Sequence, residues 1–189
     1  MLDCLDAADV HVYVEGGWGV DALIGEQTRR HLDLDLALDR DELDDARRAL
    51  EEHGFQHDAT TEPGLPARLV LRDEQGRQVD LHPLLFDQGG DGWQQLSKSG
   101  RAWGRYPAGD LNANGVIAGR HVRCLSPLLQ CRFRMGYEWS ERDEHDVRLL
   151  VEHFGLPSPP HVRVEAPTQP AASPFRKRFR FEPAPPIRS

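Results

Sequence analysis

Two aspartates in one short alternating run constrain this 189-residue chain more than any other feature. In HLDLDL (31–36), leucines alternate with His31, Asp33 and Asp35. Because successive side chains of a β-strand point to opposite faces, Asp33 and Asp35 share one face and the leucines take the other. The sequence therefore predicts a strand with one apolar face and two adjacent carboxylates.

A third carboxylate stands in a second alternating run, RLVLRDEQGRQVDLH (68–82). This run predicts a β-hairpin that turns near residues 73–77, where Gly76 supplies a permissive backbone. Asp80 then shares a face with His82, and it completes a carboxylate triad if its strand pairs with the first one. Like charges this close need a proton or a cation between them, and oxygen ligands without thiolates favour Mg²⁺ over zinc.

The glycine pair Gly16-Gly17 separates a strand pattern, VHVYVE (10–15), from a helix-like segment, WGVDALIG (18–25). Backbone N–H groups at a helix N-terminus bind phosphate where glycine lets the ligand approach. The alternatives are a tight turn without a ligand and, for the aspartates, a solvated strand edge. The combination of glycine turn, helix, D-x-D and a distant aspartate favours phosphoryl chemistry with two Mg²⁺ ions.

These motifs resemble those of a known family. GGWGVDALIGEQTRRHLDLDL (16–36) is similar to the signature of the antibiotic nucleotidyltransferases of the DNA polymerase beta superfamily. VDLHP (79–83) resembles the strand of their third carboxylate, and MGYEWSERDEHDVRLL (135–150) resembles their C-terminal helical segment. The resemblance covers residues 10–156. It is strongest to small lincosamide nucleotidyltransferases, and aminoglycoside 2''-nucleotidyltransferases come next. It implies an α/β (α+β) fold, a polymerase beta-like mixed sheet flanked by helices, with a small C-terminal helical segment.

The resemblance also implies an activity. Such enzymes use Mg²⁺ and ATP or another NTP, transfer the nucleoside monophosphate to a hydroxyl of an antibiotic, and release pyrophosphate. A lincosamide is the favoured acceptor, and an aminoglycoside is the alternative. The implied metal and catalytic residues are Asp33, Asp35 and Asp80, with Asp80 as general base in contact with metal, and the implied nucleotide-binding residues are Gly16, Gly17, Thr28 and Arg29.

Other residues near these motifs have two interpretations each. Arg30 is a phosphate ligand or an ordinary surface residue. His31 and His82 either orient a neighbouring aspartate or fill the wall of the cleft. For Asp21, in the short helix, a capping or surface role is favoured over catalysis. Residues 93–106, which include Trp93, Lys98, Trp103 and Tyr106, form either a pocket wall or a partly ordered loop.

Composition limits the class of protein. A hydrophobic content of 39% in 189 residues suits one core, or one domain with a small annex. No apolar stretch reaches the roughly 18 residues of a membrane span, and the N-terminus has no basic segment followed by an apolar one. Three cysteines, Cys4, Cys124 and Cys131, are odd in number and lack metal-ligand spacing, which fits a reducing compartment. We therefore expect a cytoplasmic protein.

The chain divides into a catalytic domain (1–125), a helical segment (126–156) and a proline-rich tail (157–189) that we expect to be disordered or extended. The first part contains a helix near 41–53 and a last hairpin turning at Gly119. Ser126-Pro127 and Ser140 predict the starts of two helices. Val147, Leu150, Val151 and Phe154 form an apolar stripe on the second of these helices, either core or the interface of a homodimer.

Net charge differs between the tail and the rest of the chain. The formal charge is −8, and the tail carries +4, so residues 1–156 carry −12. An acidic body does not favour nucleic acid and suits a cationic small molecule. The basic-aromatic run RKRFRF (176–181) favours a second hypothesis, transfer to a tRNA or protein acceptor. A binding module with an inactive core is a third, but the intact triad argues against it.

Overall fold

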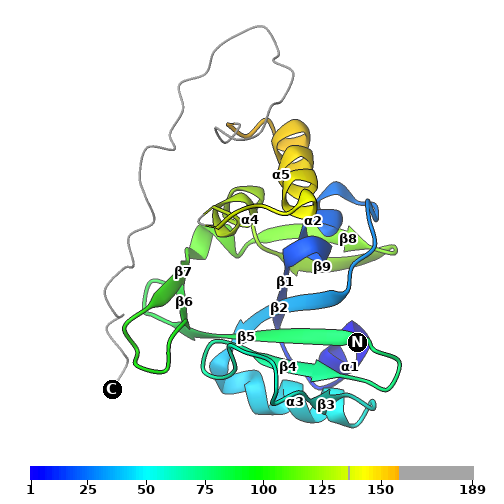
Figure 1. The fold of residues 1–189 in the computed structure, drawn as a ribbon, viewed down its shortest axis with the longest axis vertical. Helices are drawn as coiled ribbons and strands as arrows, with labels where there is room; N and C mark the ends of the chain where they lie inside the picture. Colours follow the sequence, from blue (N-terminus) through cyan, green and yellow to red (C-terminus); the bar gives the residue numbers. More distant parts are fainter. Residues whose placement is uncertain (136, 158–189) are drawn as a thin grey trace, which may run out of the picture.

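The computed structural model describes residues 1–135 and 137–157, which form a mixed sheet with helices on both faces (Figure 1). The strands are β1 (Val12–Glu15), β2 (Asp33–Asp39), β3 (Gln56–His57), β4 (Leu69–Arg72), β5 (Gln78–Phe86), β6 (Gly92–Gln95), β7 (Trp103–Tyr106), β8 (Ala113–Ile117) and β9 (Arg120–Cys124). Within the described residues, the strand order is β3-β4-β5-β2-β1-β9-β8, and β6 and β7 extend from β5. β2 pairs with β5 and β1 pairs with β9 in parallel, and the other pairs are antiparallel. The predicted mixed sheet is confirmed.

The helices lie on two sides of this sheet. They are α1 (Leu2–Ala7), α2 (Gly16–Ile24), α3 (Leu43–Glu51), α4 (Pro127–Phe133) and α5 (Glu141–Phe154), with short 3₁₀ turns at Arg40–Glu42 and Ala108–Asp110. In Figure 1, α1 and α3 lie on one side of β2 and β5, and α2, α4 and α5 lie on the other. The C-terminal helices therefore share a side with the helix that follows the glycine pair.

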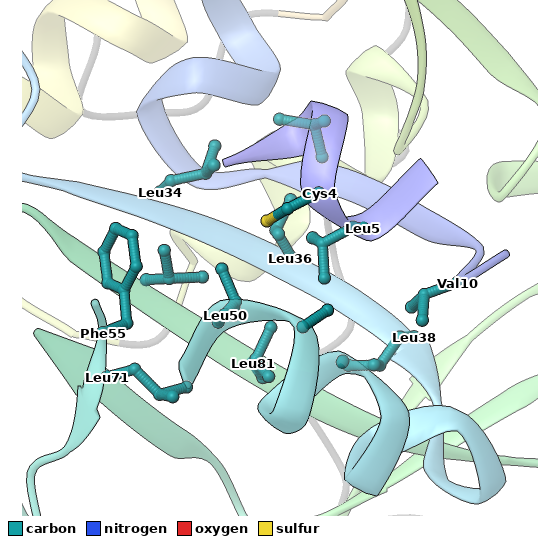
Figure 2. Packing of buried hydrophobic residues seen from close by; sticks show 14 of the residues in the cluster. Cys4, Leu5, Val10, Leu34, Leu36, Leu38, Leu50, Phe55, Leu71 and Leu81 are labelled. Carbon is teal, nitrogen blue, oxygen red and sulfur yellow. The ribbon is translucent and has the colours of Figure 1, made fainter. Parts of the chain in front are cut away.

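The alternation in β2 separates core from site. Leu34, Leu36 and Leu38 are buried in one apolar cluster with Leu5 of α1 and Leu50 of α3 (Figure 2). Asp33 and Asp35, at alternate positions, face the opposite side, where α2 packs. Burying three leucines in this way stabilises the strand by about 1.5–3 kcal/mol for each side chain. That burial also fixes the strand register, because a slip of one residue would turn the aspartates into the core.

Local signals in the sequence predicted the turns and caps correctly. β4 and β5 form the expected hairpin, with Gly76 at φ +77°, and β8 and β9 turn at Gly119. The Ser126 hydroxyl accepts a hydrogen bond from the Leu129 N–H, which caps α4. Ser140 forms a capping box with Asp143 at the start of α5. Each such cap stabilises a helix by about 1 kcal/mol.

Three expectations need correction. Val147, Leu150 and Val151 are buried in one cluster with Val20 of α2, but Phe154, the predicted fourth member of the stripe, is 38% exposed at the end of α5. Asp21 is neither a cap nor a surface residue, because it is buried and accepts a hydrogen bond from Thr28. Residues 93–106 are not a partly ordered loop, because β6 and β7 pair as a hairpin.

Some expectations concern parts of the chain that the structure does not describe. Apart from Pro157, the predicted tail (157–189) lies outside the described residues, and so does the run 176–181.

Cys4, Cys124 and Cys131 are buried and form no disulfide. In the part that is described, no helix has the length and apolar character to cross a membrane.

Candidate active site

Strand pairing brings the predicted carboxylates together. The parallel register of β2 and β5 places Asp35 opposite Asp80, and the antiparallel register of β1 and β2 places Glu15 opposite Asp35. Asp33 lies two residues before Asp35 on the same face of β2. One donor atom each of Asp35, Asp80 and His82 lie within 4.8 Å of one another. Four carboxylates therefore gather on three neighbouring strands.

Burial and charge shape the electrostatics of this cluster. Burial raises the pKa of Asp35 to about 7; nearby His82 opposes this rise, and the Asp33 and Glu15 carboxylates add to it. Burial by itself would lower the pKa of His82, but its ion pair with Glu15 and the nearby Asp35 raise that pKa to about 9. His82 is therefore an imidazolium at neutral pH and supplies one positive charge to the cluster. Its ring contacts Glu15 rather than Asp80, so it orients a carboxylate that the sequence did not single out.

Asp80 is enclosed by protein on all sides. It is 0% exposed, and it accepts hydrogen bonds from Arg68 Nη1 at 2.8 Å and from Gln78 Nε2 at 2.5 Å. The same guanidinium also donates to the backbone carbonyls of Glu62 and Pro63, which hold it in place. Arg68 is a site residue that sequence reasoning missed, although its place directly before β4, beside the strand of Asp80, was a usable signal.

The Gly16-Gly17 turn lies directly over the carboxylates. Gly16 has φ +62°, and a Cβ added there would overlap the Asp35 carboxylate. A Cβ on Gly17 would overlap the His31 ring and Arg29 Nη2. Both glycines are therefore required by close approach, and the backbone at the N-terminus of α2 lies beside Asp35 and Arg29.

We expect Gly16→Ala to lower kcat/KM about 100-fold for the nucleotidyl transfer that the resemblance implies. The added methyl group must displace the Asp35 carboxylate, and a small displacement of a catalytic group lowers the rate by about this factor. The matched control is Gly25→Ala at the other end of α2. Gly25 also has positive φ, +89°, but a Cβ there meets no atom within 4 Å. Each variant stores the backbone strain of a left-handed alanine, about 1 kcal/mol. Steady-state kinetics and thermal melts compare them, and equal activity in both would exclude the steric explanation.

A cavity of about 620 Å³ opens in front of the turn and β2. The β6–β7 hairpin supplies one wall, and α4 with the segment leading into α5 supplies the other. Its lining includes Glu15, Gly16, Gly17, Arg29, Leu32, Asp33, Asp35, His82, Gln94, Leu96, Trp103, Tyr106, Gln130, Phe133, Arg134, Tyr137, Arg142, Asp143 and Asp146. Residues 93–106 thus form a pocket wall through Trp103 and Tyr106, whereas Trp93 and Lys98 are absent from the lining. The Tyr106 hydroxyl lies 3.1 Å from Gln94 Oε1 and 3.3 Å from Glu15 Oε2, so its one proton is donated to either acceptor, and this contact ties the wall to the carboxylate cluster.

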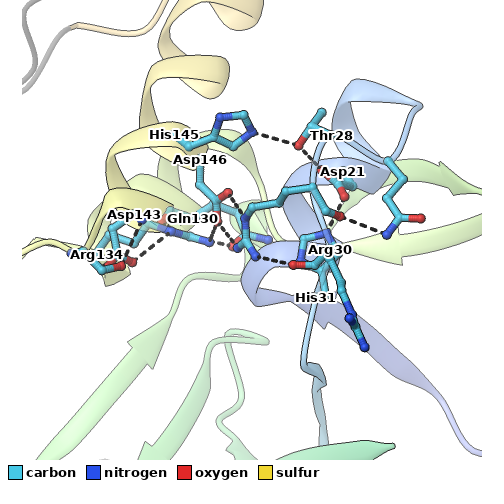
Figure 3. Close-up of polar contacts among 12 residues, drawn as sticks. Asp21, Thr28, Arg30, His31, Gln130, Arg134, Asp143, His145 and Asp146 are labelled. Atoms are coloured by element: carbon cyan, nitrogen blue, oxygen red, sulfur yellow. Dashed lines mark hydrogen bonds and ion pairs between the residues drawn. The ribbon is translucent and has the colours of Figure 1, made fainter.

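The loop between α2 and β2 is held by α5 (Figure 3). Arg29 lines the cavity and pairs with Asp146 of α5. Thr28 donates to Asp21 at 2.6 Å and contacts His145 of α5 at 3.1 Å, and it is absent from the cavity lining. The structure therefore brings Arg29 to the cavity but not Thr28, whose nucleotide contact stays a prediction. Arg30 is exposed, which fits the surface interpretation.

Two further site residues, Glu15 and Asp146, were not predicted from the sequence, although each had a signal there. Glu15 directly precedes the glycine pair, and the alternation of residues 10–15 already separated it from its apolar neighbours. Asp146 lies one helical turn before Leu150, so it is a charged residue on a buried apolar stripe, and that was a usable signal.

Comparison with known proteins decides the family. Residues 1–150 match the family described as aminoglycoside-2''-adenylyltransferase. The chain belongs to this family. The resemblance stated from residues 16–36, 79–83 and 135–150 is thereby confirmed, and so is the predicted enzyme class, an antibiotic-modifying nucleotidyltransferase.

Similar proteins include both kinds that the sequence predicted, a lincosamide resistance protein and a 2''-aminoglycoside nucleotidyltransferase. A lincosamide resistance protein of Staphylococcus haemolyticus is 28% identical over 151 residues, which span 79% of this chain and 89% of that protein. A 2''-aminoglycoside nucleotidyltransferase of Klebsiella pneumoniae is 29% identical over 126 residues, 67% of this chain and 64% of that protein. Sequence identity alone thus does not separate the two.

Solved structures agree with the fold. The crystal structure of the lincosamide antibiotic adenylyltransferase LnuA with bound lincomycin matches with a TM-score of 0.66 and 29% identity, over 79% of this chain and 90% of that one. The solution structure of ANT(2'')-Ia matches with a TM-score of 0.63 and 22% identity, over 82% of this chain and 80% of that one, which shows the fold.

Proposed function

We propose that this protein transfers a nucleoside monophosphate from an Mg²⁺-bound NTP, ATP by preference, to a hydroxyl of a lincosamide, with release of pyrophosphate. The observation that carries this proposal is the register of β2 and β5, which pairs Asp35 with Asp80 beneath the Gly16-Gly17 turn. The carboxylates offer oxygen ligands for a metal ion. The backbone N–H groups of the helix N-terminus beside them can donate hydrogen bonds to phosphate. We further propose that residues 1–125 form the catalytic domain and that the helical segment 126–156 covers its cavity.

The residues present fit a divalent cation. Asp33 and Asp35 line the cavity, and the pKa of Asp35 is raised to about 7 because burial and neighbouring carboxylates oppose its charge. A cation bound here would relieve that repulsion, and oxygen donors without thiolates suit Mg²⁺. We assign Asp33, Asp35 and Asp80 as its ligands. When bound, Mg²⁺ supplies charge neutralisation on the triphosphate and on the transferring phosphorus.

The chain's own residues orient the nucleotide and activate the acceptor. Gly16 and Gly17 present backbone N–H groups to phosphate oxygens, and the Arg29 guanidinium adds charge-assisted hydrogen bonds. An alcohol is a weak nucleophile near neutral pH, so its proton must pass to a base within hydrogen-bond reach. We assign Asp80 as this base, because one of its carboxylate oxygens lies within 4.8 Å of donor atoms of Asp35 and His82, which line the cavity. The attacking hydroxyl oxygen forms the new P–O bond as pyrophosphate departs.

The mouth of the cavity favours a lincosamide over an aminoglycoside. Leu32, Leu96 and Tyr137 line the cavity and are 59%, 40% and 55% exposed. Trp103 and Phe133 add two more apolar side chains to the cavity lining. Exposed apolar side chains around a pocket mark a binding site for a ligand with apolar groups. Lincosamides carry alkyl groups beside one basic amine, whereas aminoglycosides are polyamines with few apolar groups.

We expect Leu96→Ser to raise KM for lincomycin about tenfold, because it removes apolar contact area from the rim. KM for ATP and kcat should change less than threefold. The matched control is Leu65→Ser, since Leu65 is 45% exposed and lies outside the cavity lining. Steady-state kinetics with each substrate varied in turn make the comparison, and an unchanged KM for lincomycin would remove the rim from the acceptor site.

The deciding experiment measures pyrophosphate release from ATP and Mg²⁺ with lincomycin, clindamycin, kanamycin, gentamicin or tobramycin, and weighs each drug by mass spectrometry. The proposal predicts a mass gain of one nucleoside monophosphate on lincomycin or clindamycin. A gain on the aminoglycosides alone would transfer the proposal to the 2''-nucleotidyltransferase activity of the Klebsiella pneumoniae relative. No gain on any drug would contradict it.

A further inference from the structure

Asp146 of α5 is a buried carboxylate that joins two arginines. It is 1% exposed and accepts hydrogen bonds from Arg29 Nε at 2.8 Å, Arg29 Nη2 at 2.7 Å and Arg134 Nη2 at 2.9 Å. Arg134 is itself buried and also donates to the Gln130 carbonyl at 2.9 Å. The Arg29 contact is bidentate, so it fixes the plane of the guanidinium as well as its position.

This contact leaves the rest of the Arg29 guanidinium available. An arginine has five N–H donors, and Asp146 takes one from Nε and one from Nη2. Of the three others, one Nη1 donor makes a long contact of 3.4 Å with the Arg30 carbonyl. Arg29 lines the cavity, and its Nη2 lies so near Gly17 that a Cβ there would overlap it. The remaining donors are therefore presented beside the N-terminus of α2.

A second contact from α5 holds the same loop. His145, next to Asp146, contacts the Thr28 hydroxyl, and Thr28 donates to Asp21 of α2 (Figure 3). Residues 28 and 29 are thus tied to consecutive residues of a helix that is 117 positions away in sequence. A long arginine side chain without such a hold samples many rotamers, and each bound phosphate would have to select one of them.

We infer that Asp146 is a positioning residue, which holds the Arg29 guanidinium in the orientation that binds the triphosphate of the nucleotide. The inference rests on the proposed nucleotidyl transfer. It makes α5 a part of the nucleotide site, because Asp146 acts on the nucleotide through Arg29. Nucleotide affinity then depends on the helical segment 126–156 as well as on the glycine turn.

Asp146→Asn tests this inference in the full-length chain. The amide keeps the shape but loses the charge and one acceptor, so KM for ATP should rise about tenfold while KM for the drug stays within twofold. The control is Glu144→Gln, which removes one negative charge from the same helix at an exposed residue outside the cavity lining. Its KM for ATP should match that of the wild type. An Asp146→Asn variant with unchanged KM for ATP would overturn the inference.

A double variant separates positioning from general loosening. If Asp146 acts through Arg29, then Arg29→Met and Arg29→Met/Asp146→Asn should have the same KM for ATP, whereas additive effects would overturn the inference. Should Asp146→Asn not fold, Arg29→Lys decides. Lysine keeps the charge but cannot hold the bidentate contact, so a tenfold rise in KM for ATP supports positioning and wild-type kinetics contradict it.

The same set of variants distinguishes the inference from the proposed function. If the wild type modifies no drug, the proposed function has failed, and calorimetry of Mg²⁺-ATP binding to the wild type and to Asp146→Asn still measures the effect. A tenfold loss of affinity supports positioning, and equal affinities overturn it.

Discussion

Replacing Asp35 by asparagine is expected to lower kcat at least about 1,000-fold, which corresponds to about 4 kcal/mol of transition-state stabilisation. The amide keeps the size of the side chain but is a much weaker ligand for Mg²⁺. The fold should persist without metal, because Asp35 lies among Asp33, Glu15 and Asp80, and burial already raises its pKa to about 7. Removing this charge relieves repulsion, so the melting temperature of the metal-free protein should not fall.

Two measurements make the Asp35 prediction specific. Turnover is measured by mass spectrometry of the drug, and metal binding is measured as the rise in melting temperature on addition of Mg²⁺-ATP, which the variant should lose. The matched control is Asp39→Asn on the same strand, since Asp39 lies outside the cavity lining and caps the 3₁₀ turn that follows. Asp33→Asn should behave like Asp35→Asn. Retained turnover in either site variant would remove the metal assignment.

Alternation and turn chemistry predicted much of this fold because both are local. The leucines of residues 32–36 and the turn at Gly76 each depend on neighbours within a few residues, and so do the caps at Ser126 and Ser140. One long-range condition is also met. Asp80 could complete the carboxylate triad only if its strand paired with that of Asp35, and the register of β2 and β5 has this pairing.

The remaining site residues had local signals in the sequence, but the partners that give them a role are set by long-range packing. Asp146 meets Arg29 only after α5 packs on α2, and Arg68 reaches Asp80 only after the β4–β5 hairpin forms. Asp21 shows the same limit. A polar residue on a short amphipathic helix is normally exposed, but here Thr28 and His31 satisfy its carboxylate in a buried position. Sequence therefore predicted the strands that carry the carboxylates and missed the residues that contact Asp80 and Arg29.

Asp80→Asn should separate the chemical step from nucleotide binding. We expect kcat to fall about 1,000-fold, within the range of general-base effects, with KM for ATP changed less than threefold. Asp80 is fully buried and absent from the cavity lining, so the loss should not disturb the surface that the nucleotide contacts. Arg68 loses one partner, but its side chain is 27% exposed and keeps two backbone carbonyls, so the fold should persist.

The control for Asp80 is a second aspartate-arginine pair that involves β4. Asp58 accepts a hydrogen bond from Arg72 Nε at 2.9 Å, and neither residue lines the cavity. Asp58→Asn therefore removes the charge of another arginine-paired aspartate, one that is more exposed, and should leave kcat within twofold of the wild type. Rapid-quench measurement of a single turnover, with Mg²⁺-ATP bound before the drug is added, isolates the chemical step. If Asp80→Asn instead abolishes binding of Mg²⁺-ATP, then Asp80 acts chiefly as a metal ligand and the base must be sought elsewhere in the cluster.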